Sequence, residues 1–291
     1  MSKPSIGNET TMPIEHPIGQ AKSGFDLAAY LTRIGYDGVL DPTSETLRSL
    51  HFAHVSAIPF ENLDIVLGRG ISLDLGDLQA KLVTARRGGY CFEHNTLFAA
   101  ALESLGFTLR RLSARVRFGS TEIRPRTHML LEVEAENTRW LSDVGFGAGG
   151  LLYPIELRSG DAVQQGVWSF RIRNEDDVCV LQSQDDNSWV DLYAFTQELQ
   201  YPVDYELSNH FTSTYPHSPF VQNVIAQKNG LKSRLILRNH ELTEVRPGEL
   251  TATQQLDESE MNRVLADRFG LHFPEGTRFC RAWRDPGTEH V

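Results

Sequence analysis

The sequence predicts an α+β protein with an N-terminal helical region, a central antiparallel β-sheet or barrel, and a mixed C-terminal region. Two observations support this prediction. Apolar residues recur at helical spacing within residues 23–106, whereas apolar and polar residues alternate in several short runs within residues 107–205. Residues 206–291 combine strand-like and helix-like stretches. Residues 1–22, rich in Ser, Gly, Pro and Thr, predict a flexible N-terminal arm.

Composition limits the possible classes of function. The chain has 291 residues and a formal net charge of −10, from 28 Lys and Arg against 38 Asp and Glu. We expect no nucleic-acid partner, because phosphate contacts need clustered positive charge. We expect no membrane partner either, because no apolar run is long enough to span a bilayer. Cys91, Cys179 and Cys280 lie far apart, which predicts a cytoplasmic protein without a disulfide framework or a zinc site.

Local signals position the first two helices. Asp26 is a candidate N-cap for a helix that Gly35 ends, and a second helix begins after Thr43. This second helix carries His51 and His54 on one face. Their spacing would suit a pair of metal ligands, but no third ligand of matching spacing follows, so a structural role is favoured.

Strand patterns begin after the helical region. The expected central strands cover residues 112–118, 129–133, 139–144, 168–172, 178–182 and 189–195. In the C-terminal region we expect a loop rich in proline and aromatic residues over 201–220, strands near 221–226 and 233–239, and a helix near 259–269.

A candidate nucleophile lies at the end of the helical region. Gly88 and Gly89 precede Cys91, and a helical apolar pattern follows it, so Cys91 is predicted to lie in the first turn of a helix. The positive end of a helix favours a thiolate, and the glycines would leave room for a bound molecule to reach the sulfur. A lone cysteine beside an apolar helix is more often a buried hydrophobe. The nucleophile hypothesis therefore depends on partners elsewhere in the chain.

A histidine and an aspartate in a predicted hairpin supply such partners. If the turn centres between Ala135 and Glu136, His128 and Asp143 face each other, with Cβ atoms about 5 Å apart. The aspartate would then orient the imidazole, and the imidazole would act as base for the cysteine. His94 is a rival base within one helical turn of Cys91, but no acid in the sequence is placed to orient it.

A glycine-rich loop follows the aspartate, over residues 143–150. It lacks the lysine and the helix start of a phosphate-binding P-loop, so nucleoside triphosphate chemistry is not expected. The loop instead suits the flexible rim of an acyl-donor pocket.

Four motifs together resemble the arylamine N-acetyltransferase family in order and spacing. The motifs are Ile58-Pro59-Phe60-Glu61-Asn62-Leu63, Arg87-Gly88-Gly89-Tyr90-Cys91-Phe92-Glu93, Thr127-His128-Met129 and Asp143-Val144-Gly145-Phe146-Gly147. Ser218-Pro219-Phe220 resembles a later family landmark. The resemblance covers nearly the whole chain from about Phe25.

The resemblance implies a helical bundle over residues 23–106, a β-barrel over 107–205 and an α/β lid over 206–291, around a cysteine-protease-like core. It implies a catalytic triad, an acceptor-binding set and one contact to coenzyme A. The implied triad is Cys91, His128 and Asp143. The implied acceptor-binding residues are Phe60, Phe92, Thr127 and Phe146, and the implied contact to coenzyme A is Gly147. The implied partners are small aromatic amines or hydrazines and acetyl-coenzyme A, with no metal.

The implied reaction is acetyl transfer from acetyl-coenzyme A to an arylamine, arylhydrazine or N-hydroxyarylamine. We expect a ping-pong mechanism in which Cys91 carries the acetyl group between two half-reactions. The same residue types also serve cysteine proteases and transglutaminase-like enzymes. A binding module that sequesters aromatic ligands is a non-enzymatic alternative.

Overall fold

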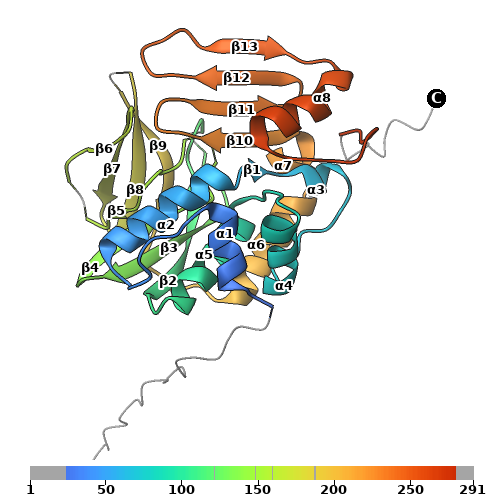
Figure 1. The fold of residues 1–291 in the computed structure, drawn as a ribbon. Helices are drawn as coiled ribbons and strands as arrows, with labels where there is room; N and C mark the ends of the chain where they lie inside the picture. Colours follow the sequence, from blue (N-terminus) through green and yellow to red (C-terminus); the bar gives the residue numbers. More distant parts are fainter. Residues whose placement is uncertain (1–23, 121, 148, 159, 187, 280–291) are drawn as a thin grey trace, which may run out of the picture.

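A computed structural model describes residues 24–279, except residues 121, 148, 159 and 187. The predicted arm over residues 1–22 and Cys280 lie outside the described residues. The structure confirms the α+β class: helices gather at one end, a curled sheet follows, and a second sheet lies across both (Figure 1). One apolar core joins the helices to the curled sheet.

The first two helices begin where local chemistry predicts, and the first also ends there. The Asp26 side chain caps α1 by accepting from the backbone N–H of Ala29 at 3.0 Å, and Gly35 ends that helix at φ +69°. Thr43 caps the second helix in the same way. The helical elements of this region are α1 (Leu27–Ile34), α2 (Ser44–Ala57), α3 (Leu63–Val66), α4 (Leu75–Leu78), the π-helical turn η1 (Gln79–Thr84) and α5 (Cys91–Ser104).

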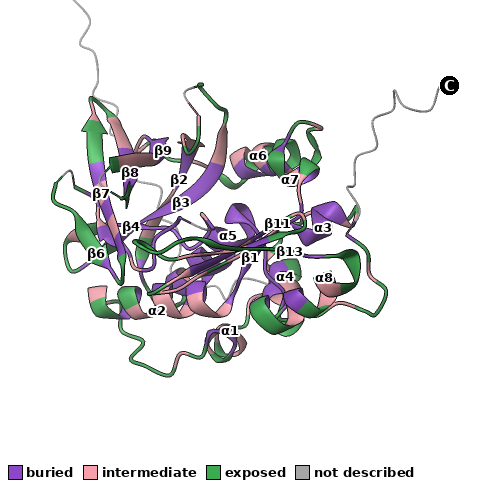
Figure 2. Ribbon diagram, turned by 90° about the horizontal axis from the view of Figure 1, so that it is seen from above, coloured by how far each residue is buried: buried purple, intermediate pink, exposed green. Residues whose placement is uncertain are grey.

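The central helix α5 is buried on almost every side. Residues 91–95 and 97–102 are all buried, and Figure 2 shows this helix in purple at the centre of the molecule. It packs against β3 and β2 on one side and against α4 and α1 on the other. The start of this helix is therefore held by the core of the protein rather than by a surface loop.

Eight strands of the described chain form one antiparallel sheet that curls into a nearly closed barrel (Figure 2). The strands are β2 (Thr108–Val116), β3 (Arg126–Ala135), β4 (Thr138–Ser142), β5 (Ile155–Glu156), β6 (Val163–Gln165), β7 (Trp168–Glu175), β8 (Val178–Asp185) and β9 (Ser188–Phe195). Their order across the sheet is β5-β4-β3-β2-β9-β8-β7-β6. All six predicted central strands overlap strands of this sheet, although those predicted over 112–118 and 139–144 end two residues earlier, at Val116 and Ser142.

The predicted register of the β3–β4 hairpin is wrong by two residues. The turn centres on Glu136 and Asn137, which have φ values of +52° and +60°, and Ala135 pairs with Thr138. A two-residue turn with both central φ values positive matches the twist of the flanking strands, and asparagine tolerates that conformation. A shift of two residues keeps every side chain on its predicted face of the sheet.

A second antiparallel sheet lies across the top of Figure 1, in the order β1-β10-β11-β12-β13. Its strands are β1 (Phe60–Glu61), β10 (Ile225–Asn229), β11 (Arg234–Arg238), β12 (Glu241–Val245) and β13 (Ala252–Gln255). The helix α8 (Glu258–Val264) and the π-helical turn η2 (Leu265–Phe269) pack on it around a smaller apolar core. The edge strand β1 belongs to the N-terminal region, so this sheet joins that region to the C-terminal region of the described chain.

The prediction of a loop over residues 201–220 is wrong. This segment contains α6 (Pro202–Thr214) and α7 (Pro219–Gln222), so the predicted strand also begins later, at Ile225. The apolar residues Val203, Leu207 and Phe211 of α6 face solvent, so their pattern does not indicate a buried helix face. The division of the chain at residues 106 and 205 stays a prediction. None of the described helices is long and apolar enough to cross a membrane.

Candidate active site

Cys91 is the first residue of α5, as the sequence predicts. Its side chain is buried, with 3% of the residue exposed, and Sγ lies 3.7 Å from the carbonyl oxygen of Thr127 at the start of β3. The first N–H groups of a helix have no partner within the helix, and they point toward whatever lies at its start. The sulfur is thus held between the positive end of α5 and the strand that carries His128.

His128 and Asp143 meet as predicted, although they do not face each other directly across the hairpin. Nε2 of His128 lies 2.7 Å from Oδ2 of Asp143, and both residues are buried. Since Nε2 is engaged, Nδ1 is the ring atom left for the interaction with the side chain of Cys91. Burial disfavours the imidazolium, but Asp143 and Cys91 outweigh it and raise the pKa of His128 to about 10. The arrangement favours an imidazolium at His128, next to the sulfur of Cys91.

Asn95 fixes the carboxylate of Asp143, a role that the sequence reasoning missed. Its Nδ2 donates to Oδ1 of Asp143 at 2.9 Å and to the carbonyl oxygen of Met129 at 2.7 Å. Its Oδ1 accepts from the backbone N–H of Val144 at 3.2 Å. Asn95 follows Cys91 by four residues on α5, and this spacing placed it on the same helix face. Despite its burial, Asp143 has a lowered pKa because His128, Asn95 and a backbone N–H stabilise the charge.

The histidines of α2 have structural roles. Nδ1 of His51 donates to the carbonyl oxygen of Leu152 at 3.0 Å, and Nε2 accepts from the backbone N–H of Asp143 at 3.3 Å. Burial lowers the pKa of His51 to about 4, so this ring stays neutral. The described residues contain no cluster of metal-ligating side chains.

The rival base His94 has other partners than Cys91 at both ring nitrogens. Its Nε2 lies 3.2 Å from the carbonyl oxygen of Pro59, and because a carbonyl oxygen can only accept, this nitrogen carries the proton and donates. Its Nδ1 therefore accepts a hydrogen bond from Nε2 of His54 at 2.8 Å. Nδ1 of His54 then accepts from the hydroxyl of Tyr30 at 2.8 Å. Burial lowers the pKa of His94 to about 4. Both ring nitrogens of His94 are therefore occupied inside the helical region.

The two glycines before Cys91 accommodate the protein's own chain, not a bound molecule. A Cβ on Gly88 would lie 2.0 Å from the carbonyl oxygen of Pro59, and a Cβ on Gly89 would lie 2.7 Å from a carboxylate oxygen of Glu93. The expected role of these glycines in leaving room for a bound molecule is corrected accordingly. Gly145 has a similar function at the triad, because its Cβ would lie 2.8 Å from Cα of Cys91.

Two aromatic rings pack on His128, and a second aromatic pair forms between Phe60 and Phe220. Phe146 and Tyr193 pack on the ring of His128, with centroid distances of 5.1 and 4.8 Å. Phe60 packs on Phe220 at 5.9 Å, and Phe220 follows Ser218-Pro219, the landmark noted in the sequence. These four rings come from segments far apart in the chain. Phe146 and Tyr193 thus give the imidazole of His128 an aromatic surrounding.

The remaining predicted site residues occupy different positions. Phe92 is fully buried against Tyr90 and Tyr205, at 5.4 and 6.2 Å, in the core between α5 and α6. Thr127 contributes its backbone oxygen next to the Cys91 sulfur. Gly147 has a φ of +80° and packs against the ring of Phe60, and its carbonyl oxygen accepts from Asn229 at 2.7 Å.

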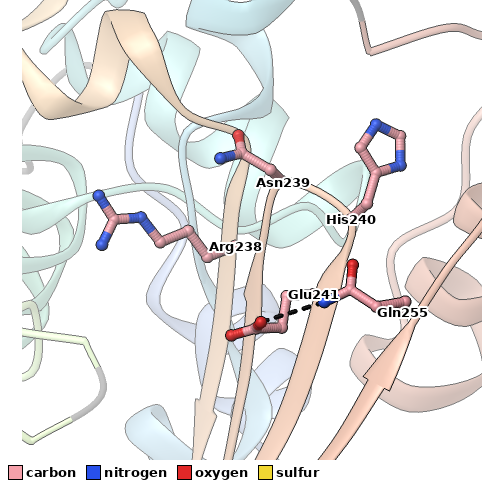
Figure 3. A pocket seen from close by; sticks show the side chains of 5 residues that line it. All are labelled: Arg238, Asn239, His240, Glu241 and Gln255. Carbon is pink, nitrogen blue, oxygen red and sulfur yellow. Dashed lines mark hydrogen bonds between the residues drawn. The ribbon is translucent and has the colours of Figure 1, made fainter.

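A separate shallow pocket lies at the turn between β11 and β12 (Figure 3). Its lining residues are Arg238, Asn239, His240, Glu241 and Gln255. Glu241 and Gln255 are joined across the strands by a hydrogen bond of 3.1 Å. None of the triad residues lines it, so it is not part of the candidate active site.

Comparison with known proteins gives a consistent assignment. The sequence model of a family described as N-acetyltransferase matches residues 43–277. An arylamine N-acetyltransferase / N-hydroxyarylamine O-acetyltransferase of Salmonella typhimurium is 38% identical over 250 residues, which cover 84% of this chain and 88% of that protein.

Solved structures agree with the sequence comparison. The arylamine N-acetyltransferase of Nocardia farcinica is 43% identical, with a TM-score of 0.82 over 87% of this chain and 92% of that one. A structure of the Mycobacterium marinum arylamine N-acetyltransferase in complex with CoA is 36% identical, with a TM-score of 0.80 over 84% of this chain and 93% of that one. The family match and these relatives show that the chain belongs to the arylamine N-acetyltransferase family.

Proposed function

We propose that this protein transfers the acetyl group of acetyl-coenzyme A to the nitrogen of arylamines, arylhydrazines or N-hydroxyarylamines, by way of an acetyl-cysteine at Cys91. The contact between His128 and Asp143 beside the sulfur, at 2.7 Å, is the observation that carries the proposal. The relatives' names supply the substrate class, and the structure of a relative with CoA supplies the acetyl carrier.

In the first half-reaction the Cys91 thiolate attacks the carbonyl carbon of the thioester. A new carbon–sulfur bond forms, and the carbonyl oxygen becomes an oxyanion that the free N–H at the start of α5 would stabilise. The bond between the carbonyl carbon and the coenzyme A sulfur then breaks. The imidazolium of His128 gives its proton to the leaving thiolate, which departs as free coenzyme A.

In the second half-reaction the neutral imidazole acts as the base. The amine nitrogen attacks the acetyl carbon while His128 takes a proton from the nitrogen, and Cys91 leaves as a thiolate. The thiolate and the imidazolium are restored, so each turnover conserves the number of protons. Asp143 and Asn95 keep the imidazole in the orientation that both steps require.

The acceptor pocket would be formed by Phe60, Phe146 and Phe220, with Thr127 at its edge. Aromatic amines suit such a pocket, because they are uncharged at neutral pH and their rings stack on phenylalanine. Phe92 would support this pocket from the core. Gly147 would contact coenzyme A through its backbone. A cytoplasmic location, inferred from the isolated cysteines, is part of the same proposal.

The specificity is tested by turnover of an aromatic amine and of an aliphatic amine of similar size with acetyl-coenzyme A, measured as release of free coenzyme A. We expect kcat/KM to be about a hundredfold higher for the aromatic amine, because the aliphatic amine is protonated and lacks ring contacts. Equal values would contradict the proposed acceptor class. Water as the preferred acceptor would indicate a hydrolase.

A further inference from the structure

A chain of buried charges lies beneath the start of α5. The ammonium Nζ of Lys81 is 2.7 Å from Oε1 of Glu93 and 2.8 Å from Oδ2 of Asp64. The guanidinium of Arg87 continues the chain to Asp64 at 3.2 Å and to Glu61 at 2.7 Å. These charges come from β1, α3, η1, α5 and the segment before α5, so they join the elements around the nucleophile.

Glu93 connects this chain to the helix that carries Cys91. Its Oε2 accepts from the backbone N–H of Tyr90, the residue directly before Cys91, at 3.1 Å. Gly89 allows the carboxylate to reach this position, because any side chain there would collide with it. The carboxylate therefore fixes the point at which α5 begins.

A buried carboxylate needs a partner to keep its charge. Only 1% of Glu93 is exposed, and burial raises its pKa to about 7, although Lys81 and the N–H of Tyr90 oppose the shift. The carboxylate of Glu61 adds to the upward shift. Lys81 is the cation in direct contact with Glu93, so without its ammonium the carboxyl group would take up a proton.

We propose that Lys81 and Glu93 act as one positioning unit for Cys91. Lys81 keeps the buried carboxylate charged, and the charged carboxylate holds the Tyr90 N–H, so that the sulfur stays within reach of His128. The inference rests on the proposed function of Cys91. Neither residue touches the reacting atoms, so neither is a catalytic residue.

Three variants test this unit: Lys81→Met, Glu93→Gln and the double variant. The readout is the rate of Cys91 acylation by p-nitrophenyl acetate, followed by release of p-nitrophenolate. We expect each single variant and the double variant to be about fivefold slower than wild type at pH 8, because a hydrogen bond to a charged acceptor is replaced by a neutral one. The double variant loses one charge of each sign, so its slowing does not come from a change in net charge.

Two results would overturn the proposal. If the double variant slows by the product of the two single effects, the residues act independently and not as one unit. If the ratio of wild type to Glu93→Gln stays the same between pH 8 and pH 6, protonation of Glu93 is not involved. We expect that ratio to shrink to within about twofold at pH 6, because the wild-type carboxyl group is then protonated.

A matched control comes from α6. Asp204 accepts from the backbone N–H of Tyr201 at 2.8 Å, which is the same capping contact away from the active site. Asp204→Asn is expected to leave the acylation rate unchanged. If Lys81→Met does not fold, the proposal is still tested by the isosteric variant Glu93→Gln, through the change in the ratio of wild-type to variant acylation rates between pH 8 and pH 6. Absence of any acylation of wild-type Cys91 would instead refute the proposed function, whereas equal acylation of all variants would refute only the positioning unit.

Discussion

Replacing Asn95 with alanine tests how the triad is held together. The change removes donors to Asp143 at 2.9 Å and to the carbonyl oxygen of Met129 at 2.7 Å, and it removes the acceptor of the Val144 N–H at 3.2 Å. All three partner groups lie in buried residues. A buried polar group that loses its partner costs about 1–3 kcal/mol. The free energy of unfolding is therefore expected to fall by about 3–6 kcal/mol, allowing for partial relaxation.

The activity of Asn95→Ala is expected to fall as well. The Asp143 carboxylate loses one of its fixed contacts, and the imidazole that it orients becomes misaligned with Cys91. A misplacement of about 1 Å can lower a rate about a hundredfold. We therefore expect kcat/KM of Asn95→Ala to fall roughly tenfold to a hundredfold. Urea denaturation measures the stability and release of coenzyme A measures the activity.

Asn262→Ala is the control for this variant. Asn262 lies in α8, is only partly buried and donates one hydrogen bond, to the carbonyl oxygen of Thr277 at 3.0 Å. We expect this control to lose no more than about 1 kcal/mol and to keep its activity. If Asn95→Ala behaved like Asn262→Ala in both assays, the role assigned to Asn95 would be wrong.

Three further predictions follow from the same site. Cys91→Ala should abolish acetyl transfer and keep the circular dichroism spectrum of the folded protein, whereas the control Cys179→Ser should remain active. Acetyl transfer by Cys91→Ala would disprove the role of Cys91 as nucleophile. Gly145→Ala should lower kcat/KM about tenfold or more, because its Cβ would lie 2.8 Å from Cα of Cys91; unchanged kinetics would show that the contact relaxes freely. The pKa of His128 is raised from 6.5 to about 10, so its stabilising effect is complete below pH 6.5 and is lost as the pH rises through about 10. Urea denaturation should show this loss in wild type and a smaller one in His128→Gln, and equal profiles would refute it.

The starts of α1 and α2 could be predicted because they depend on local chemistry. Asp26 and Thr43 cap helices through hydrogen bonds to residues only three positions away. The contact between His128 and Asp143 could be predicted because side chains alternate between the two faces of a strand, so a register error of two residues leaves both on the same face. The register itself was wrong, because it depends on which two residues adopt positive φ in the turn.

Features that depend on contacts between distant segments could not be predicted. Gly88 is next to the nucleophile in sequence, yet the group that it accommodates is the carbonyl of Pro59 from another segment. Phe220 joins Phe60 from a part of the chain predicted as loop, because the helix before it exposes its apolar face. Asn95 was within reach of prediction, since it lies one helical turn beyond Cys91, but only the fold shows which carboxylate it binds.

The central claim is that Cys91 carries the acetyl group between coenzyme A and the acceptor. Incubation of the protein with acetyl-coenzyme A, without an amine, should add about 42 Da to the intact mass and place it on the peptide that contains Cys91. Subsequent addition of an arylamine should remove this mass and release the acetylated amine. A ternary mechanism without a covalent intermediate would leave the mass unchanged, and that result would contradict the account.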